Sequence, residues 1–277
     1  MAGPIEDQVI LITGSTDGLG KATALELASR GARVLLNGRD RQRGQAALDE
    51  IRKVSGNPSV ELCLADLSSQ RQVRLLAGEV LSRYNRLDAL VNNAGVFMRK
   101  RQISEDGLEV TFAVNVLAPF LLTQLLLERM VRSSPARIIN ISSSTHWSAH
   151  IDWDNLQGER YYNGYDAYAL SKLGDILITY ALAMRLKSGR VTANCLDPGV
   201  LNTRMLREGW GSSTGADPKT GAEKVVFQVT DPDLEFTSGE YFQDHRPAES
   251  SGQSYDRQLQ EQFWQVCEHL SSEGKGL

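Results

Sequence analysis

The sequence predicts an α/β protein built on a doubly wound parallel sheet of about seven strands, with helices on both faces. Short apolar runs, typical of strands buried on both faces, alternate with amphipathic helical stretches along the whole chain. A glycine-rich turn, residues 14–20, joins the first apolar run to the first helical stretch. No internal repeat or linker interrupts this alternation, so residues 1–277 are expected to form a single domain of the Rossmann type.

The predicted strands are short and apolar, and each ends at a turn or at the start of a helix. They are residues 8–13, 33–37, 60–64, 87–91, 136–141, 190–196 and 240–242. The predicted helices have apolar residues at helical spacing, and several end at glycine or proline. They are residues 21–30, 42–54, 69–84, a long helix within 106–130, 165–186, 221–230 and 254–270, followed by a frayed tail at 271–277.

The bulk composition is that of a soluble globular protein and excludes several classes. With 41% hydrophobic residues, 23% charged residues and a net charge of −4, the chain has no general attraction for nucleic acid or anionic membranes. No apolar run reaches the ~18 residues of an integral membrane segment, and the first residues do not resemble a secretory signal. Cys63, Cys195 and Cys267 are far apart and lack metal-binding spacing, which indicates a reducing, cytoplasmic location.

The glycine-rich turn is a candidate phosphate cradle. Glycines let the backbone turn tightly and approach a pyrophosphate, and the following helix presents free N–H groups at its N-terminus. The spacing is GxxxGxG rather than the more common GxGxxG fingerprint, so a glycine turn without a ligand is the alternative. The residues of the predicted cradle are Gly14, Ser15, Thr16, Asp17, Gly18, Leu19 and Gly20.

The end of the second strand decides which cofactor fits. A carboxylate there would hold the ribose hydroxyls of NAD, whereas an arginine accommodates the 2′-phosphate of NADP. The strand ends in Asn37, and Arg39 follows it, which favours NADP(H). Two acidic residues, Asp17 and Asp40, leave NAD(H) open. Arg43 fits an exposed helix start as well as a phosphate contact.

Small and polar residues follow the third and fourth strands, where a parallel sheet presents its carboxyl ends to a ligand. Asp66, followed by Leu67, could contact an adenine amino group or cap the next helix. Asn93, Ala94 and Gly95 suit a surface against which a cofactor lies. We therefore expect these strand ends to border the bound nucleotide.

Tyr168 and Lys172 are four residues apart on a predicted helix, so their side chains share one face. A free phenol has a pKa near ~10, and the lysine ammonium is expected to lower it and make Tyr168 an acid/base. A packed tyrosine beneath a solvated lysine is the structural alternative. Ser143, in a serine run after the fifth strand, could reach the same cleft or cap a turn.

Asn115 lies in the apolar interior of the long helix, four residues before Pro119. Because proline removes a backbone hydrogen bond, we expect a kink and a free carbonyl near Asn115 that could hold a water. A buried asparagine tied to a neighbouring group is an equal alternative.

Two irregular segments are candidates for substrate contacts. Residues 145–166 carry several aromatic side chains, as functional loops over an α/β sheet often do. His146 and His150 in this loop lack a third ligand, so no metal site is expected. Residues 204–220 are rich in Gly, Ser and Thr and are expected to form a mobile flap. Together the two segments suggest a bulky, apolar alcohol or ketone as the substrate.

These motifs occur together in the order and spacing of the short-chain dehydrogenase/reductase family, which the chain resembles over essentially its whole length. The resemblance is carried by residues 13–20, 92–95, Asn115, the serine run, Tyr168 with Lys172, and residues 197–199. Segments 137–147, 154–173 and 238–247 are similar to the branch of retinol dehydrogenases and WW-domain oxidoreductases.

The resemblance implies an NAD(P)-dependent oxidoreductase that acts on CH–OH groups, with Tyr168 as the acid/base. Lys172 would lower the pKa of Tyr168 and hold the nicotinamide ribose, Ser143 would bind the substrate oxygen, and Asn115 would anchor a relay water. The implied cofactor contacts are Gly14, Gly18 and Gly20 at the pyrophosphate, Asp66 near adenine, Asn93, Ala94 and Gly95 at the adenosine ribose, and Pro198, Val200 and Thr203 at the nicotinamide.

The predicted function is therefore hydride transfer between a nicotinamide and the alcohol or carbonyl group of a small-molecule substrate. The alternatives are a non-catalytic NADP(H)-binding sensor or scaffold protein, and an isomerase or dehydratase of the same fold. Many members of the family self-associate through the helices that here bear Asn115 and Tyr168, so the resemblance also implies a homo-oligomer, either a dimer or a tetramer.

Overall fold

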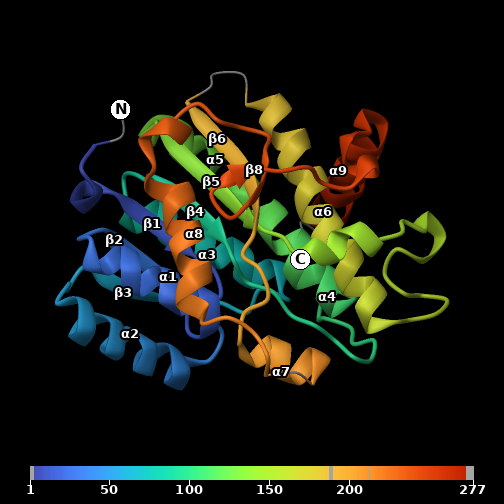
Figure 1. Ribbon diagram of the computed structural model, residues 1–277, viewed down its shortest axis with the longest axis horizontal. Helices are drawn as coiled ribbons and strands as arrows, with labels where there is room; N and C mark the ends of the chain where they lie inside the picture. The colour runs from blue at the N-terminus through green and yellow to red at the C-terminus, as the bar shows by residue number, and fades with distance from the viewer. Residues whose placement is uncertain (1–2, 187–189, 212, 273–277) are drawn as a thin grey trace.

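The computed structural model describes residues 3–186, 190–211 and 213–272. They form a single sheet flanked by helices, as Figure 1 shows. The strand order is β3-β2-β1-β4-β5-β6-β7-β8, and every neighbouring pair is parallel except β7 and β8. The predicted doubly wound sheet is confirmed. Position 212 of the predicted flap and positions 273–277 of the predicted tail lie outside the described residues.

The strands agree with the predicted runs to within about two residues, and one strand was missed. Their bounds are β1 (Val9–Ile12), β2 (Arg33–Gly38), β3 (Val60–Leu64), β4 (Ala89–Asn92), β5 (Ala136–Ile141), β6 (Val191–Asp197), β7 (Tyr241–Gln243) and β8 (Arg246–Pro247). The missed strand is β8, because two residues are too short to show an alternating pattern.

The helices also follow the predicted order, with several ends displaced. Their bounds are α1 (Gly18–Ser29), α2 (Arg41–Ser55), α3 (Gln70–Arg83), α4 (Val110–Phe112), α5 (Ala118–Ser133), α6 (Gly164–Arg185), α7 (Arg204–Trp210), α8 (Pro218–Thr230) and α9 (Arg257–Ser272). Short helical turns are η1 (Ile5–Asp7), η2 (Ala113–Leu117), η3 (Ser144–Ser148), η4 (Trp153–Asn155), η5 (Pro232–Leu234) and η6 (Gly252–Tyr255).

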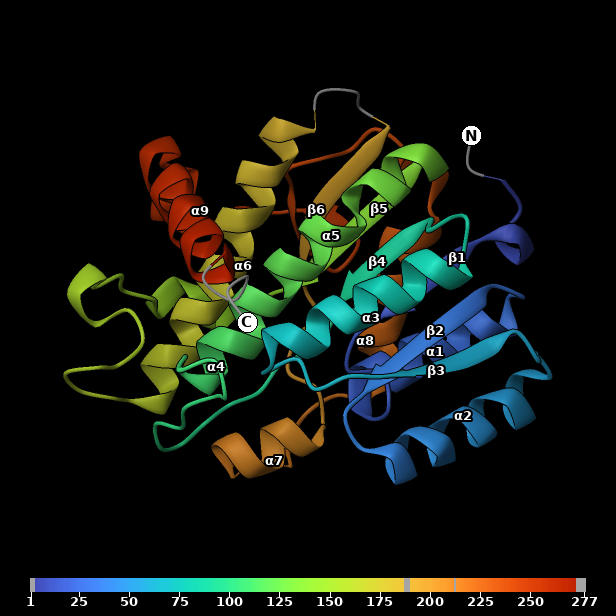
Figure 2. The ribbon, with the colours of Figure 1, turned by 180° about the vertical axis from the view of Figure 1, so that it is seen from behind.

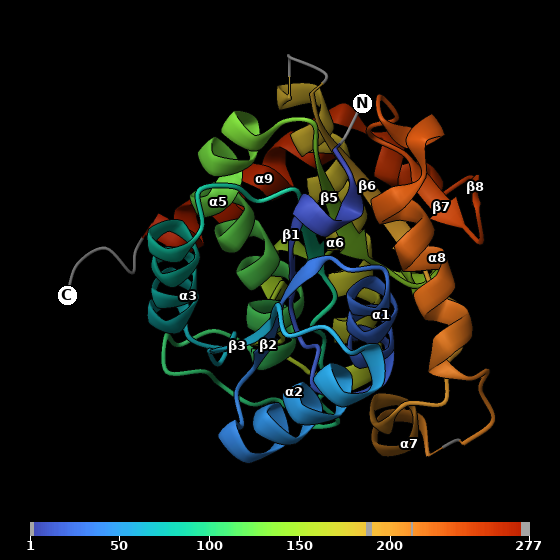
Figure 3. The same ribbon diagram turned by 90° about the vertical axis from the view of Figure 1, so that its left-hand side faces the viewer.

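Two layers of helices cover the two faces of the sheet. Figure 3 shows α3 and α5 on one side and α1 and α8 on the other. Successive residues of β1 face opposite layers, because side chains alternate along a strand: Leu11 packs in the cluster with α3 and α5, whereas Ile10 and Ile12 pack in the cluster with α1 and α8. This two-sided burial explains why the strands are continuous apolar runs.

Side-chain caps set where several helices begin. Asp17 accepts a hydrogen bond from the Gly18 N–H, so α1 starts at Gly18, three residues before the predicted start. Ser69 caps α3, and Asn163 caps α6. Because α1 begins inside the glycine-rich turn, its N-terminal N–H groups face the end of the sheet where a ligand would bind.

The long helix predicted within residues 106–130 is broken by a wide turn. The short helix α4 is followed by η2, a π-helical turn in which the Ala118 N–H bonds to the Ala113 carbonyl, five residues earlier. Pro119 occupies the first turn of α5, where its missing N–H is tolerated. The expected break is therefore real, but it takes the form of a widened turn that contains Asn115 instead of a simple proline kink.

The predicted flap at residues 204–220 is not irregular throughout. Arg204–Trp210 form helix α7, which begins after the Thr203 cap and ends at Gly211 in the left-handed conformation, with φ 66°. The next helix, α8, starts at Pro218 behind the Asp217 cap. The Gly and Ser content of the segment concealed this helix, because seven residues are too few to show a clear amphipathic pattern.

The C-terminal helix α9 packs across α6 and η2, the turn before α5, on the side seen in Figure 2. The rings of Phe120 and Trp264 lie 4.8 Å apart, edge to face. A Cβ atom on Gly174 would stand 2.8 Å from the Phe263 ring, so glycine lets α9 approach α6 closely. The α5 and α6 helices, which the resemblance placed at subunit contacts, are thus partly covered by the chain's own last helix.

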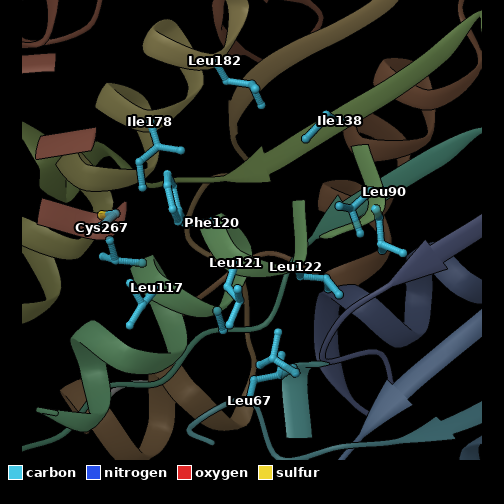
Figure 4. Packing of buried hydrophobic residues seen from close by; sticks show 14 of the residues in the cluster. Leu67, Leu90, Leu117, Phe120, Leu121, Leu122, Ile138, Ile178, Leu182 and Cys267 are labelled. Carbon is cyan, nitrogen blue, oxygen red and sulfur yellow. The ribbon is translucent and has the colours of Figure 1, made fainter. Parts of the chain in front are cut away.

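One helical run among the described residues, Val110–Ser133, is long and apolar enough to cross a membrane by those two criteria. Its most apolar window is 78% buried inside the protein. Figure 4 shows Phe120, Leu121 and Leu122 of this run in the same cluster as Leu90 and Ile138 of the sheet. Its apolar composition is accounted for by the core.

Candidate active site

A cavity of about 520 Å³ opens at the carboxyl ends of the parallel strands, where doubly wound proteins bind ligands. Most of the residues predicted to bind a cofactor or to catalyse line it. They are Gly14, Thr16, Asp17, Gly18, Leu19, Gly20, Arg39, Asp66, Leu67, Asn93, Ala94, Gly95, Ser143, Tyr168, Lys172, Pro198, Val200 and Thr203. Segments far apart in sequence therefore meet at one site.

Two predicted site residues lie behind the cavity wall. Ser15 is fully buried, and its hydroxyl joins β1 to β2 by donating to the Ile12 carbonyl and accepting from the Asn37 N–H. Asn115 is also buried, so neither side chain touches the cavity. The Ser15 hydroxyl holds the strands together, so the predicted contact of Ser15 with the cofactor would involve its main chain and stays a prediction.

The glycine-rich turn is shaped by close contacts between main chains. Gly14 and Gly18 have φ angles of +62° and +52°, which glycine adopts most readily. A Cβ atom on Gly20 would stand 2.4 Å from Asn93 Nδ2 and 2.5 Å from the Gly14 carbonyl oxygen. Asn93 itself donates to the carbonyls of Thr13 and Gly14 at 2.8 and 3.1 Å. Asn93, which follows β4, therefore holds the glycine-rich turn in position.

Charged side chains of both signs border the far end of the cavity. Arg39 pairs with Asp66 at 3.8 Å, and Arg43 and Asp17 line the same region. Asp66 also accepts hydrogen bonds from the N–H and hydroxyl of Ser68, which fixes the turn before α3. The helix cap is Ser69, so capping by Asp66 is excluded. Two guanidinium groups face a space that a nucleotide phosphate would fit.

Tyr168 and Lys172 lie one turn apart on α6 with both side chains buried, as their spacing predicted. The Lys172 Nζ atom is 5.6 Å from the centre of the Tyr168 ring. Nζ also donates to the Ile141 carbonyl at 2.7 Å and to Asp175 Oδ2 at 2.9 Å. The lysine is therefore not a solvated side chain above a packed tyrosine.

Opposing effects set the pKa of Tyr168, and the predicted lowering by Lys172 is one of them. Burial raises the pKa of Tyr168 and outweighs the opposing effect of Lys172, while Asp175 and Asp197 raise it further. The effect of Lys172 has the predicted sign but is not dominant. Sequence spacing identified the cation and could not show the burial or the two carboxylates.

The three serines that follow β5 make different contacts. The Ser142 hydroxyl donates to the Lys172 carbonyl at 2.7 Å and joins β5 to α6. The Ser144 N–H donates to Asp197 Oδ2 at 3.0 Å. Ser143 is half-buried, lines the cavity beside Tyr168, and accepts from the Thr145 N–H at 3.3 Å as the cap of η3. Ser143 therefore both lines the cleft and caps a turn, the two roles that the sequence analysis left open.

His146, one turn after Ser143, is fully buried and uses both ring nitrogens. Its Nδ1 lies 2.7 Å from the Ser143 carbonyl, which can only accept, and its Nε2 lies 3.1 Å from the Ser251 N–H. The ring is therefore neutral, with its hydrogen on Nδ1. Burial lowers the pKa of His146, against smaller raising effects of the Ser143 carbonyl and Asp197.

Asn115 holds the wall of the cavity from behind. Its Oδ1 accepts from the Val96 N–H at 2.8 Å, and its Nδ2 donates to the Val96 carbonyl and to Ser171 Oγ, both at 3.0 Å. The amide is satisfied by protein groups, which agrees with the reading of a buried asparagine tied to neighbours. A role for its main-chain carbonyl in holding a water stays a prediction.

The aromatic wall near Tyr168 combines Trp210, from the predicted 204–220 flap, with Phe97, which the sequence analysis did not single out. The Trp210 ring, on α7, lies 5.0 Å from the Tyr168 ring, and the Phe97 ring lies 4.3 Å from that of Trp210. The predicted substrate loop at 145–166 contributes only Thr145 to the cavity lining, and its Trp147, Trp153 and Tyr161 are exposed. The predicted contact of this loop with the substrate therefore stays a prediction.

A nicotinamide nucleotide fits these residues by their chemistry. The glycine turn and the N-terminus of α1 suit a pyrophosphate, and Arg39 and Arg43 also line the cavity. The cavity runs on from there to Tyr168 and Ser143. Within the described ranges, no group of three or more His, Cys, Asp or Glu side chains is placed to hold a metal ion.

Comparison with known proteins agrees with this site. Residues 8–211 match the family model described as short chain dehydrogenase. Retinol dehydrogenase 11 of Homo sapiens is 39% identical over 95% of this chain and 86% of its own length. Retinol dehydrogenase 12 of Mus musculus is 38% identical over 96% of this chain and 87% of its own length.

Solved structures show the same fold. A protein from Mycobacterium paratuberculosis is 28% identical and superposes with a TM-score of 0.80 over 96% of this chain and 94% of its own. A short chain dehydrogenase from Escherichia coli CFT073, complexed with NADPH, is 25% identical with a TM-score of 0.71 over 88% of this chain and 98% of its own. The chain therefore belongs to the short chain dehydrogenase family and is an NAD(P)-dependent oxidoreductase that acts on CH–OH groups.

Proposed function

We propose that the cavity binds NADP(H) together with a bulky, apolar alcohol or carbonyl compound, and that Tyr168 exchanges a proton with the substrate oxygen. The observation that carries this proposal is the placement of Tyr168, Lys172 and Ser143 on the wall of the cavity that also contains the glycine cradle. Two relatives are retinol dehydrogenases, so retinal and retinol are the first substrates to test.

Each polar side chain has one task in this proposal. A bound NADP(H) supplies or accepts the hydride at the substrate carbon. In carbonyl reduction the Tyr168 hydroxyl donates its proton to the substrate oxygen, and in alcohol oxidation the phenolate takes a proton from it. The Ser143 hydroxyl donates a hydrogen bond to the same oxygen and stabilises the charge that develops there. Lys172 has one N–H beyond its two protein contacts to hold the nicotinamide ribose.

The role of Tyr168 is tested by Tyr168→Phe. Removing the hydroxyl removes the proton donor but keeps the packing against Trp210, so kcat should fall about 1000-fold while the affinity for NADPH stays unchanged. A screen of NADPH and NADH oxidation against aldehydes, ketones and retinal first identifies the substrate. Near-wild-type turnover by the variant on that substrate would sink the proposed role. The site and the relatives offer nothing that favours the non-catalytic alternative.

The preference for NADP(H) over NAD(H) rests on Arg39, with Arg43 beside it. Arg39→Ala should raise KM for NADPH about tenfold and leave KM for NADH unchanged, because only NADPH carries the additional phosphate. Arg41→Ala is the matched control, since Arg41 is exposed and does not line the cavity. Equal effects on both cofactors would contradict the preference, with Asp66 then the better candidate for a ribose contact.

We also propose a homo-oligomer, a dimer or tetramer, and a cytoplasmic location. Because α9 packs on α5 and α6, an assembly through these helices would include α9 in its interface. Cys63, Cys195 and Cys267 are all buried and unpaired, which supports a reducing compartment. Sedimentation of the full chain tests the assembly, and fractionation of cells that express it tests the location.

A further inference from the structure

Helix α6 contains a buried ion pair that the proposed mechanism does not use. Lys172 Nζ lies 2.9 Å from Asp175 Oδ2, and each residue is only 4% exposed. Removing two charges from water is costly, and their attraction offsets that cost only when the geometry is good and other hydrogen bonds are made. Such a pair beside a reacting group therefore calls for an explanation beyond stability.

Asp175 acts on the site through Lys172. The two residues are three positions apart on α6, which places Asp175 nearly one turn further along the helix, and Asp175 does not line the cavity. A lysine ammonium has three N–H groups, of which one is donated to the Ile141 carbonyl and a second to Asp175. Two anchors hold Nζ close to Gly95, where a Cβ atom would stand 3.9 Å from it. The remaining N–H is thereby left for the cavity.

The titratable groups that face this pair come from two elements. Tyr168 shares α6 with the pair, and Cys195 faces it from β6, where Asp197 acts on Tyr168. Burial lowers the pKa of Lys172, but Asp175, Tyr168 and Cys195 raise it and the net shift is upward. Burial raises the pKa of Asp175 to about 6 against the lowering effect of Lys172. The 2.9 Å contact between Nζ and Oδ2 identifies Asp175 as the carboxylate partner of the lysine ammonium.

We propose that Asp175 is a positioning residue for the hydride-transfer reaction: its carboxylate fixes the Lys172 ammonium beside Tyr168 and offsets part of the ammonium's charge. This inference rests on the proposed roles of Tyr168 and Lys172. Without Asp175, the ammonium would keep a single protein anchor, and Tyr168 would face a cation with no carboxylate beside it.

Loss of the Asp175 charge should shift the pKa values of Tyr168 and Lys172 in the same direction. Loss of its negative charge lowers the pKa of Tyr168, because Asp175 raises it, and lowers the pKa of Lys172 for the same reason. Carbonyl reduction requires a protonated Tyr168 and a charged Lys172. The alkaline limb of kcat/KM should therefore move to lower pH in Asp175→Asn, by about one pH unit.

The experiment measures kcat/KM for carbonyl reduction by NADPH between about pH 7 and 11.5 in the wild type, Asp175→Asn and Asp175→Glu, because the alkaline limb of the wild type is expected above pH ~10. The asparagine has the same shape without the charge, whereas the glutamate keeps the charge one methylene further out. We expect the alkaline limb to shift in Asp175→Asn and to stay within about 0.3 pH unit in Asp175→Glu. Asp166→Asn is the matched control, since it removes an exposed carboxylate from the same helix and should not shift the limb.

Two outcomes would overturn the inference: an unshifted limb in folded Asp175→Asn, or an equal shift in Asp175→Glu, which would point to packing instead of charge. Circular dichroism and thermal melting establish that each variant is folded. Should Asp175→Asn not fold, Asp175→Ser replaces it in the same assay with the same expected shift. An inactive Tyr168→Phe combined with an unshifted Asp175→Asn would reject only this inference, whereas an active Tyr168→Phe would reject the proposed function itself.

Discussion

The two ends of the cavity are built in different ways. At the nucleotide end the wall is main chain, and Gly20 lies so close to it that a Cβ atom would come within 2.5 Å of the Gly14 carbonyl oxygen. At the substrate end the wall is made of side chains, with the Trp210 ring against those of Tyr168 and Phe97. Trp210 belongs to a helix of seven residues, and Arg99 bonds that helix at the Gly209 carbonyl.

This difference shows which part of the site can vary. A main-chain wall fits one shape of ligand, because any added side chain collides with backbone atoms. An aromatic wall on a short surface helix can be exchanged without moving the strands. We therefore expect changes in the cradle to affect cofactor affinity and changes in α7 to affect substrate selection.

The largest expected effect is that of Gly20→Ala. The new methyl group meets Asn93 Nδ2 and the Gly14 carbonyl, so the cradle must open and the affinity for NADPH should fall about 100-fold, equivalent to about 3 kcal/mol. Titration of the protein with NADPH, followed by its fluorescence, measures this change.

Gly78→Ala is the control for that variant. Gly78 lies within α3, and nothing is within 4 Å of the Cβ it would gain. This substitution should leave NADPH affinity unchanged and raise the free energy of unfolding by about 0.5–1 kcal/mol, since alanine favours a helix. If Gly20→Ala bound NADPH as tightly as Gly78→Ala, the main-chain wall would not limit the nucleotide.

A smaller effect, confined to the other end, is expected for Trp210→Ala. Loss of the ring removes the aromatic face beside Tyr168, so KM for a bulky apolar substrate should rise about tenfold while NADPH affinity stays constant. Trp153→Ala is the matched control, because Trp153 is 43% exposed in the 145–166 loop and does not line the cavity. A larger rise in KM from Trp153→Ala than from Trp210→Ala would show that the 145–166 loop, and not α7, contacts the substrate.

The smallest expected effect is on the pH dependence of stability, and it comes from His146, which contacts the Ser143 turn. His146 supports the Ser143 turn and is buried in neutral form, so its folded-state pKa lies below the unfolded value of 6.5. Its contribution to stability is present above pH 6.5 and is lost as the pH falls towards the folded-state pKa, by at most about 1.4 kcal/mol per pH unit. Urea unfolding between pH 4.5 and 7.5 measures this slope.

The matched pair for that measurement is His146→Gln and His150→Gln. The first should flatten the acid slope of the free energy of unfolding, because the titrating ring is gone. The second removes an exposed histidine from the same loop and should keep the wild-type slope. Equal slopes in both variants would show that another group governs acid stability.

Much of the nucleotide end could be predicted from the sequence because it is encoded locally. The strand, the glycine turn and the helix are consecutive, and glycine at positions 14, 18 and 20 indicates the required backbone directly. Tyr168 and Lys172 share a helix face by spacing alone. At the substrate end the 204–220 segment could be predicted, but its helix α7 and the contact of Trp210 with Tyr168 could not, since these depend on how α7 folds against the rest of the chain.

The sequence by itself determined the parallel sheet, the cradle and the pairing of Tyr168 with Lys172, because periodicity and short spacings are local properties of the chain. Only the tertiary structure decided the electrostatic setting of Tyr168, which depends on burial and on Asp175 and Asp197. The same holds for the tasks of Ser15 and Asn115, whose hydrogen bonds join separate segments. Burial and contacts between distant segments arise from packing, and packing is a property of the whole fold.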